Sequence, residues 1–298
     1  MRRRFFTLDV FTARRFAGNV LAVVLDSDGL GDAAMQAVAR EFNLSETVFV
    51  VPPDDPRHRA RLRIFTPARE LPFAGHPTVG TAVLLAHLDG GAGERELVLG
   101  ESVGPVACTV QPGKDGGSAS FAIPRLPERI GGALDIPTIA AALSLQASDI
   151  GFGNFMPDSW SAGNAFTFVP LRGLEAMARA QPDMAIWSQV FGDDRPPGAY
   201  LYCTEAVDRG ASYHTRMFAP VMGVLEDPAT GSAAAAFTGV LAASGQFAEG
   251  SHELTVEQGV EMGRPSLIRL TLTMRGGMLA TAWVGGDAVI VSEGAIEA

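Results

Sequence analysis

The chain has little cysteine, no long apolar run and a deficit of positive charge. Its two cysteines, Cys108 and Cys203, sit in apolar, strand-like surroundings, so we expect them to be buried and reduced. Apolar stretches such as residues 82–88 are too short to span a bilayer, and Asp9 interrupts the one near the N-terminus that could begin a signal peptide. The net charge of −10 disfavours nucleic acid and anionic membranes as partners. The expectation is a cytoplasmic protein.

Common motifs of cofactor and hydrolase chemistry are missing as well. Residues 151–156 lack the third glycine of a dinucleotide-binding loop, and no GxxxxGK[ST] phosphate loop occurs. Ser232 does not lie in a G-x-S-x-G elbow, which disfavours a serine hydrolase. The histidines show no metal-ligand spacing with cysteines or carboxylates; they are His58, His76, His87, His214 and His252.

What the chain does contain is an internal repeat. The segment Arg63–Pro67 (RIFTP) is followed by Gly75–Ala82 (GHPTVGTA), and in the second half Arg216–Pro220 (RMFAP) is followed by Glu226–Ala233 (EDPATGSA). The two phenylalanines of the first pair are 153 residues apart, and His76 matches Asp227 at 151. The chain of 298 residues therefore reads as two versions of one domain of about 150 residues.

A further echo and the pattern of elements support this division. Ala17-Gly18-Asn19 and Ala162-Gly163-Asn164 each precede an apolar run, 145 residues apart. Residues 124–149 are rich in proline and glycine and predict a linker with one short helix. We place the domains at residues 1–126 and 127–285, with the active site in the cleft between them.

Strands outnumber helices in both halves, and each half has one long apolar helix, so the fold class is α+β with a mostly antiparallel sheet wrapped around a central helix. Helices are expected over residues 32–41, 77–87, 174–180 and 228–244. Strands are expected over residues 5–10, 19–25, 47–51, 61–65, 97–99, 106–110, 119–123, 166–170, 199–204, 215–218, 254–256, 267–274, 279–284 and 288–292.

The starts of the two apolar helices are the strongest candidates for chemistry. Pro77 and Pro228 suit the first helical position, which makes His76 and Asp227 the expected N-cap residues. A helix N-terminus offers unpaired N–H groups and partial positive charge, so two of them facing one cleft would bind a carboxylate or a developing enolate. Taken alone, Asp227 is as consistent with a plain N-cap as with a functional residue, and His76 is better explained as a surface histidine or one with satisfied hydrogen bonds. The repeat is what pairs them.

Glu46 is the third candidate, because it is the one charged residue at an otherwise apolar strand entry, Asn43–Val50. A carboxylate among apolar neighbours has a raised pKa, which suits proton transfer near neutral pH. The alternative is a solvated charge at a strand edge. The second half contains no matching glutamate at this point of the repeat.

These residues together resemble the PhzF family, the phenazine-biosynthesis-like isomerases of the diaminopimelate epimerase fold. The matching segments span nearly the whole chain: Asp9–Thr12, Phe16–Asn19, Asn43–Val48, Arg63–Gly80, Glu226–Ala233 and Gly263–Ser266. The resemblance implies two pseudo-symmetric domains, with the C-terminal strand, about residues 286–298, returning to the first. It also implies a homodimer without a cofactor or metal.

The resemblance assigns roles to individual residues. Glu46 falls on the general acid/base of the family, and His76 and Asp227 fall on its cleft histidine and aspartate. Contacts with the substrate would come from a further set of residues: Ser45, Gly75, Gly231 and Ser232. The related epimerases carry two cysteines at these helix starts, whereas Cys108 and Cys203 lie elsewhere, so a two-thiol racemase is not expected.

The leading expectation is a cofactor-independent isomerase that moves a proton on a small carboxylated substrate, as in the isomerisation of trans-2,3-dihydro-3-hydroxyanthranilate. Two alternatives stay open. One is an epimerase or racemase of an amino or hydroxy acid, and the other is a non-catalytic ligand-binding or interaction protein on the same fold. A fold by itself does not select among them.

Overall fold

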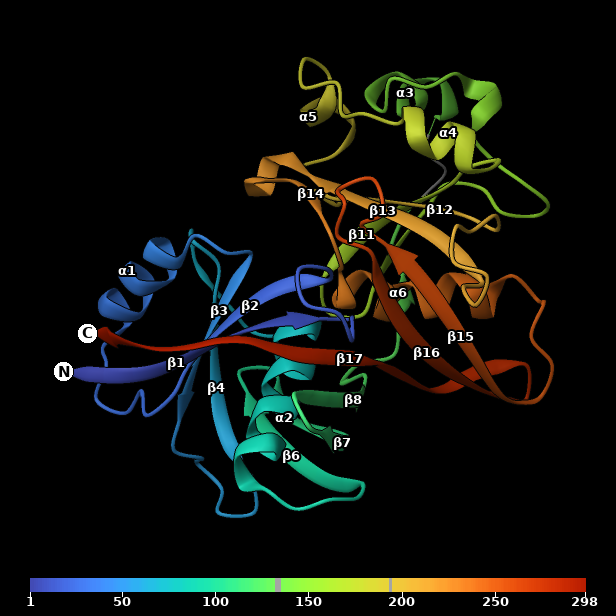
Figure 1. Cartoon of the computed structure of the whole chain (residues 1–298). Coiled ribbons are helices and arrows are strands. Elements are labelled where there is room, and N and C mark those ends of the chain that lie inside the picture. The colour runs from blue at the N-terminus through green and yellow to red at the C-terminus, as the bar shows by residue number, and fades with distance from the viewer. Residues whose placement is uncertain (132–134, 193–194) are drawn as a thin grey trace. The chain divides into compact units, whose positions relative to one another are not determined.

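The computed structural model describes residues 1–131, 135–192 and 195–298. It divides into two compact units, residues 1–124 with 284–298 (unit 1) and residues 125–283 (unit 2) (Figure 1). The domain division expected from the sequence, residues 1–126 and 127–285, stays a prediction. Gly132, part of the predicted linker, lies outside the described residues.

Unit 1 is a closed sheet wrapped around one helix, α2 (Gly75–Asp89) (Figure 1). Every residue of α2 from Gly75 to Ala86 is buried, because strands surround it on all sides. Its strands are β1 (Arg2–Val10), β2 (Asn19–Val24), β3 (Glu46–Val51), β4 (Ala60–Phe65), β5 (Glu70–Leu71), β6 (Arg95–Glu101), β7 (Gly104–Gly113), β8 (Gly116–Ala122) and part of β17 (Met278–Glu297).

The C-terminal strand closes this sheet. β17 pairs antiparallel with β1, from Arg2 opposite Glu297 to Val10 opposite Ala288, and it also pairs with β8. The sequence predicted two separate strands at 279–284 and 288–292, but β17 is continuous, since Gly285 and Gly286 do not interrupt its pairing. Gly285 is needed there because a Cβ would lie 2.7 Å from the Ala119 carbonyl oxygen. Residues 284–298 of the chain therefore belong to unit 1.

Helix α1 (Asp32–Phe42) covers the outside of the unit 1 sheet (Figure 1). It is amphipathic, and its buried residues Met35, Val38 and Ala39 pack on Val24, Phe49 and Phe65 of the strands. It ends at Asn43, which adopts the left-handed conformation (φ 50°) that asparagine tolerates. This turn leads the chain directly into β3.

Unit 2 repeats the arrangement around α6 (Gly231–Ala243), which is buried over almost its whole length. Its strands are β9 (Glu128–Arg129), β10 (Asp158–Ser161), β11 (Ala165–Pro170), β12 (Ala199–Cys203), β13 (Tyr213–Ala219), β14 (Val224–Asp227), β15 (Gly250–Gln258) and β16 (Ser266–Arg275). The sequence did not predict the short strands β5, β9, β10 and β14, because two to four residues are too few to show a period.

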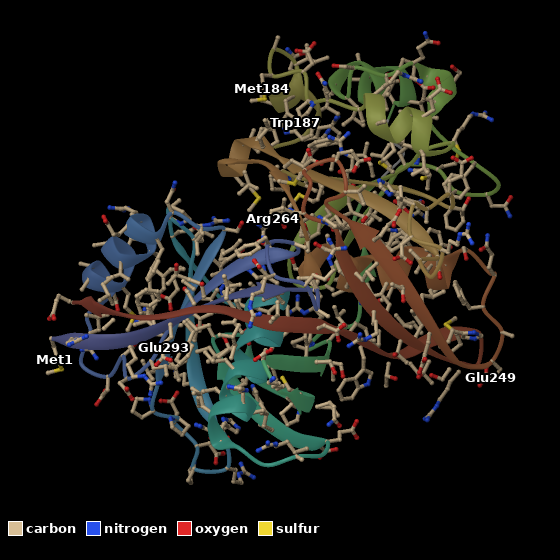
Figure 2. The ribbon with its side chains drawn as sticks, in the orientation of Figure 1. Met1, Met184, Trp187, Glu249, Arg264 and Glu293 are labelled. Carbon is tan, nitrogen blue, oxygen red and sulfur yellow. The ribbon has the colours of Figure 1, made fainter. Side chains whose placement is uncertain are left out.

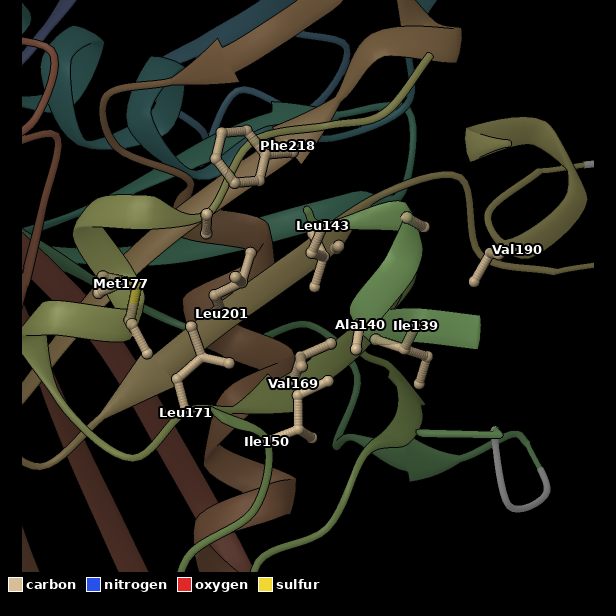
Figure 3. Close-up of a cluster of buried hydrophobic side chains, with 14 of the residues drawn as sticks. Ile139, Ala140, Leu143, Ile150, Val169, Leu171, Met177, Val190, Leu201 and Phe218 are labelled. Atoms are coloured by element: carbon tan, nitrogen blue, oxygen red, sulfur yellow. The ribbon is translucent and has the colours of Figure 1, made fainter. Parts of the chain in front are cut away.

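An outer layer of short helices covers the other face of the unit 2 sheet: α3 (Ile136–Ala142), α4 (Leu174–Arg179) and α5 (Trp187–Val190) (Figure 1). Two 3₁₀ segments complete unit 2: η1 (Ala147–Asp149) follows α3, and η2 (Pro220–Met222) lies between β13 and β14. Ile139 and Leu143 pack with Met177 and the strand residues Val169 and Leu201 in one apolar cluster (Figure 3). Trp187 is fully buried in this cluster, whereas Met184 beside it is exposed (Figure 2).

The predicted repeat is confirmed by the order and direction of strand pairing. In unit 1 β1–β2 is antiparallel, β2–β3 parallel, β3–β4 antiparallel, β4–β6 parallel and β6–β7 antiparallel. In unit 2 the same sequence of directions runs through β10–β11, β11–β12, β12–β13, β13–β15 and β15–β16. No helix of the described chain combines the length and apolar character that crossing a membrane requires.

Side chains repeat as well. Arg63 on β4 binds Glu70 on β5 through two hydrogen bonds and lies over the ring of Phe65. Arg216 on β13 binds Glu226 on β14 in the same way and lies over Phe218. The arginines of the RIFTP and RMFAP segments therefore form equivalent ion pairs. In each pair the planar guanidinium group binds both carboxylate oxygens through two parallel hydrogen bonds.

Candidate active site

The first group of predicted site residues gathers at the N-terminus of α2 in unit 1. The helix begins at Gly75 after the extended N-cap Ala74, so His76 is its second residue and Pro77 its third. The prediction that His76 is the N-cap is wrong by two residues. Proline is tolerated this far in because the first four N–H groups of a helix have no partner within the helix.

His76 is 4% exposed and lies between Glu46 and Asn19. Its Nε2 is 3.4 Å from Glu46 Oε2, and its Nδ1 is 3.4 Å from Asn19 Nδ2. Burial lowers the pKa of His76 to about 3, and a backbone hydrogen bond with Val20 opposes this only in part. The ring is therefore neutral at physiological pH and carries one donor and one acceptor nitrogen.

Glu46 reaches His76 because of two features of the chain before it. The left-handed turn at Asn43 ends α1, and β3 then begins at Glu46, which lies opposite Leu21 of β2 in a parallel pair. The Glu46 side chain is 18% exposed, so it is sheltered but open to solvent on one side. Ser45, the preceding residue, is half-buried. The structure thus brings Glu46 and His76 together, as the sequence predicted for two of the three catalytic candidates.

The second group lies at the start of α6 in unit 2. Here the N-cap is Thr230 and the helix begins at Gly231, so the prediction of Asp227 as N-cap and Pro228 as first helical residue is wrong. Asp227 is instead the last residue of β14 and is 7% exposed. The Thr230 hydroxyl donates to Asp227 Oδ2 at 2.5 Å.

The later helix start has a clear cause, because side chains outside the segment bind its backbone. Gln258 Nε2 donates to the Asp227 carbonyl oxygen at 2.7 Å, and the Ser266 hydroxyl donates to the Pro228 carbonyl oxygen at 2.9 Å. These carbonyl oxygens are therefore already satisfied, and the helical pattern begins only beyond them. A Cβ at Gly259 would lie 2.6 Å from the same Pro228 oxygen, so glycine is required there.

Measured from the helix starts, Ser232 is the counterpart of His76. Each is the second residue of its central helix, directly after Gly231 and Gly75 respectively. Gly231 is buried and Ser232 is half-buried. The sequence echo paired His76 with Asp227 instead, because Phe218 and Glu226 are eight positions apart in the second half, whereas Phe65 and Glu70 are five apart in the first.

Sequence reasoning did not select two polar residues that the structure places in direct contact with the site residues. Asn19, 1% exposed, contacts His76, and Gln258, fully buried, binds the segment from Asp227 to Thr230. A signal existed for Asn19, since it belongs to the repeated Ala-Gly-Asn motif. None existed for Gln258, whose partners are 28 and 31 residues away in the sequence.

No three histidine, cysteine, aspartate or glutamate side chains within residues 1–131, 135–192 and 195–298 are arranged to hold a metal ion. Cys108 and Cys203 are free and buried, as predicted, and neither lies at a helix start. A surface groove of about 410 Å³ lies between the β7–β8 turn, which carries Lys114, and residues 287–289 of β17. It contains none of the predicted site residues.

The comparison with protein families decides the identity of the chain. The model of the PhzC-PhzF family, described as phenazine biosynthesis-like protein, matches residues 8–294. The chain belongs to the PhzC-PhzF family. The resemblance inferred from the sequence is thereby confirmed.

Individual relatives of this family member match over nearly its whole length. An uncharacterized isomerase of Mesorhizobium japonicum is 49% identical over 98% of both chains. The trans-2,3-dihydro-3-hydroxyanthranilate isomerase of Pseudomonas fluorescens is 36% identical over 97% of both chains. The crystal structure of a PhzF-family phenazine biosynthesis protein of Bacillus anthracis superposes with a TM-score of 0.88, at 26% identity and with full coverage of both chains. The expected enzyme class, an isomerase, and the expected α+β fold are confirmed.

Proposed function

We propose that this PhzC-PhzF protein is a cofactor-independent isomerase that moves a proton between two carbons of a small carboxylated substrate. One observation carries the proposal: Glu46, a partly solvent-accessible carboxylate, lies 3.4 Å from a buried, neutral His76 at the N-terminus of α2. A carboxylate beside a neutral imidazole can accept a proton and pass it on without a metal or cofactor. The 36% identical relative that isomerises trans-2,3-dihydro-3-hydroxyanthranilate supports a substrate of that class.

The proposed reaction is a proton shift in which Glu46 is both base and acid. Glu46 takes a proton from an activated carbon, and the C–H electron pair enters the conjugated system of the substrate. Glu46 then returns the proton to a different carbon, so no group is gained or lost overall. His76 and Asp227 relay protons or hold the polar groups of the substrate during this shift.

Substrate binding is proposed to use the starts of both central helices. The N–H groups there, with Gly75 and Gly231 free of side chains, can approach a carboxylate closely and favour negative charge. Ser45 and Ser232 add hydroxyl groups. The proposal takes the working protein to be a homodimer, as the family resemblance implies, and places it in the cytoplasm.

The test is proton NMR in D₂O of the purified protein with dihydro-hydroxyanthranilate and a panel of small amino and hydroxy acids. Glu46→Gln keeps the size of the side chain but removes the base, so deuterium incorporation should fall by about 100-fold or more. Glu41→Gln, at an exposed position of α1, is the matched control and should exchange at the wild-type rate. Wild-type exchange by Glu46→Gln would refute the role given to Glu46.

The same experiment separates the alternatives. Loss of optical activity without a change in absorbance would identify an epimerase or racemase. Binding of carboxylates without exchange of any C–H proton would identify a ligand-binding protein on this fold.

A further inference from the structure

A second carboxyl group lies close to the helix start in unit 1. Glu101, the last residue of β6, is 7% exposed, and its Oε1 is 2.7 Å from the hydroxyl oxygen of Thr78 in the first turns of α2. Its Oε2 is buried and has no hydrogen-bond partner among the residues that the structure describes. A buried carboxylate with one unsatisfied oxygen is costly, whereas a neutral carboxylic acid is much less so.

The two short contacts of the Thr78 hydroxyl can both be hydrogen bonds only if Glu101 carries a proton. The Thr78 hydroxyl oxygen lies 2.8 Å from the carbonyl oxygen of Ala74, the N-cap of α2, as well as 2.7 Å from Glu101 Oε1. A hydroxyl group has one proton, and a carbonyl oxygen can only accept. If Thr78 donates to Ala74, the contact with Glu101 is a hydrogen bond only when Glu101 donates to Thr78.

The repeat supports this assignment independently. β15 corresponds to β6, since each pairs parallel with the strand that carries the repeated arginine and phenylalanine. The last residue of β15 is Gln258, and its Nε2 donates to the hydroxyl oxygen of Thr230, the N-cap of α6, at 3.0 Å. A protonated glutamate is nearly the same shape as glutamine and also donates from one terminal atom. The two units therefore hold their helix starts with equivalent donors.

We propose that Glu101 is a positioning residue, held as a neutral carboxylic acid that donates to Thr78 and fixes the turn of α2 that carries Gly75 and His76. Only the catalytic consequence rests on the proposed function. The protonation state and its effect on the turn stand on the contacts within unit 1.

The electrostatic surroundings are consistent with a neutral acid at physiological pH. Burial raises the pKa of Glu101 from 4.5 to about 8, and the hydrogen bond that the Thr78 hydroxyl can donate to the ionised carboxylate opposes this shift in part. The Cys108 thiol on β7 is the other titratable group that interacts with it, and its pKa is raised by burial first and then by the Glu101 charge. Above pH 8 Glu101 ionises and can only accept, so the Thr78 hydroxyl turns its single proton from the Ala74 carbonyl oxygen to the carboxylate.

Three variants test whether Glu101 acts as a hydrogen-bond donor or only fills the space beside Thr78. Glu101→Gln keeps a donor at every pH, and Glu101→Leu removes it. Glu96→Gln makes the same chemical change at an exposed position of the same strand and serves as the control. Infrared spectra at pH 6.5 should show a protonated carboxylic acid band in the wild type and in Glu96→Gln that is missing in Glu101→Gln. An unchanged spectrum in Glu101→Gln would overturn the assignment.

The positioning effect has a readout that does not need a substrate. In ¹H–¹⁵N spectra the Gly75 amide and the His76 ring should shift through a transition near pH 8 in the wild type. In Glu101→Gln both signals should stay at their low-pH positions up to pH 9, and in Glu101→Leu they should be displaced at every pH. If Glu101→Gln titrates as the wild type does, Glu101 does not position this turn.

Turnover supplies the catalytic test once an exchanging substrate is known. One pH unit above the transition, the turnover rate of the wild type should be about tenfold lower than its rate below the transition. The turnover rate of Glu101→Gln should stay constant over the same pH range. A plateau in the wild type through pH 9 would overturn the catalytic consequence. Failure to find any substrate would count against the proposed function alone, because the infrared and NMR results decide the state of Glu101 without it.

Discussion

At the scale of single residues, the neutral state of His76 is the feature that most constrains chemistry. A protonated histidine beside Glu46 would form an ion pair, and the carboxylate would then be a weaker base. Burial prevents this, because it lowers the pKa of His76 to about 3. Glu46 therefore faces a neutral ring that can accept on one nitrogen and donate from the other.

The neutrality of His76 can be measured directly. We predict that its ring ¹⁵N signals, identified by their loss in His76→Gln, do not titrate between pH 5 and 7, below the transition assigned to Glu101. Its folded pKa lies below the unfolded value of 6.5, so the unfolded state binds more protons and the free energy of unfolding falls as pH drops from 6.5 towards 3. His76→Gln should weaken this acid dependence. A His76 signal that titrates near pH 6.5 would contradict the buried neutral ring.

At the scale of elements, the two central helices show why their starts were misplaced by sequence reasoning. Proline predicts the first helical position, but any of the first four N–H groups of a helix is free of an intrahelical partner. Pro77 therefore fits as the third residue of α2. Pro228 lies before α6 because distant side chains, Gln258 and Ser266, bind the carbonyl oxygens around it. Neither outcome follows from local propensity.

Close packing of α2 against its strands depends on Gly80. A Cβ at this position would lie 2.6 Å from Leu21 Cδ2 and 2.7 Å from Val10 Cγ2, closer than real contacts allow. Alanine favours a helix more than glycine does, but overpacking costs more, so Gly80→Ala should destabilise unit 1 by about 1–3 kcal/mol. Hydrogen exchange of the α2 amides measures this loss.

The control for Gly80→Ala is Gly31→Ala, where no heavy atom lies within 4 Å of the new Cβ. Gly31 is the N-cap of α1, so its replacement should change stability by less than about 1 kcal/mol. Equal effects of the two variants would show that contact with Leu21 and Val10 does not limit the approach of α2.

At the scale of the whole molecule, the two units share a strand topology, but unit 2 contains a buried polar network around His214. His214 on β13 lies between Glu257 at 2.6 Å and Glu261 at 2.9 Å, and Glu257 also accepts the backbone N–H groups of Val207 and Asp208. This buried network joins two strands and the loop before β13. Burial alone would lower the pKa of His214, but the hydrogen bonds from the ring to both glutamates raise it to about 9.

The His214 network predicts a loss of stability at alkaline pH. Its folded pKa is above the unfolded value of 6.5, so the stabilisation is complete below pH 6.5 and is lost as pH rises through about 9. The contribution at pH 6 is on the order of 2–3 kcal/mol. All three tryptophans, Trp160, Trp187 and Trp283, belong to unit 2, so urea unfolding followed by their fluorescence reports on this unit.

His214→Gln should remove most of the difference in unfolding free energy between pH 6 and pH 10. A similar difference in the variant and the wild type would show that other groups cause the alkaline loss. Removal of one partner from a buried pair also costs about 3–5 kcal/mol at neutral pH, so the comparison uses the slope with pH and not the absolute stability.

The sequence by itself determined the repeat, the two buried central helices, the family and the identity of most candidate residues. These follow from local patterns: apolar periodicity, β-branched and aromatic runs, and short motifs that recur about 150 residues apart. Strand pairing then confirmed the repeat, and the contact of Glu46 with His76 brought together two residues chosen from sequence alone.

Only the tertiary structure decided the protonation of the site and the true correspondence between its halves. The neutral His76, the polar partners Asn19 and Gln258, and the place of Glu101 depend on contacts between residues more than twenty positions apart. The match of Ser232 to His76 depends on where each helix begins. Burial and long-range hydrogen bonds set these features, and neither is encoded in a local pattern.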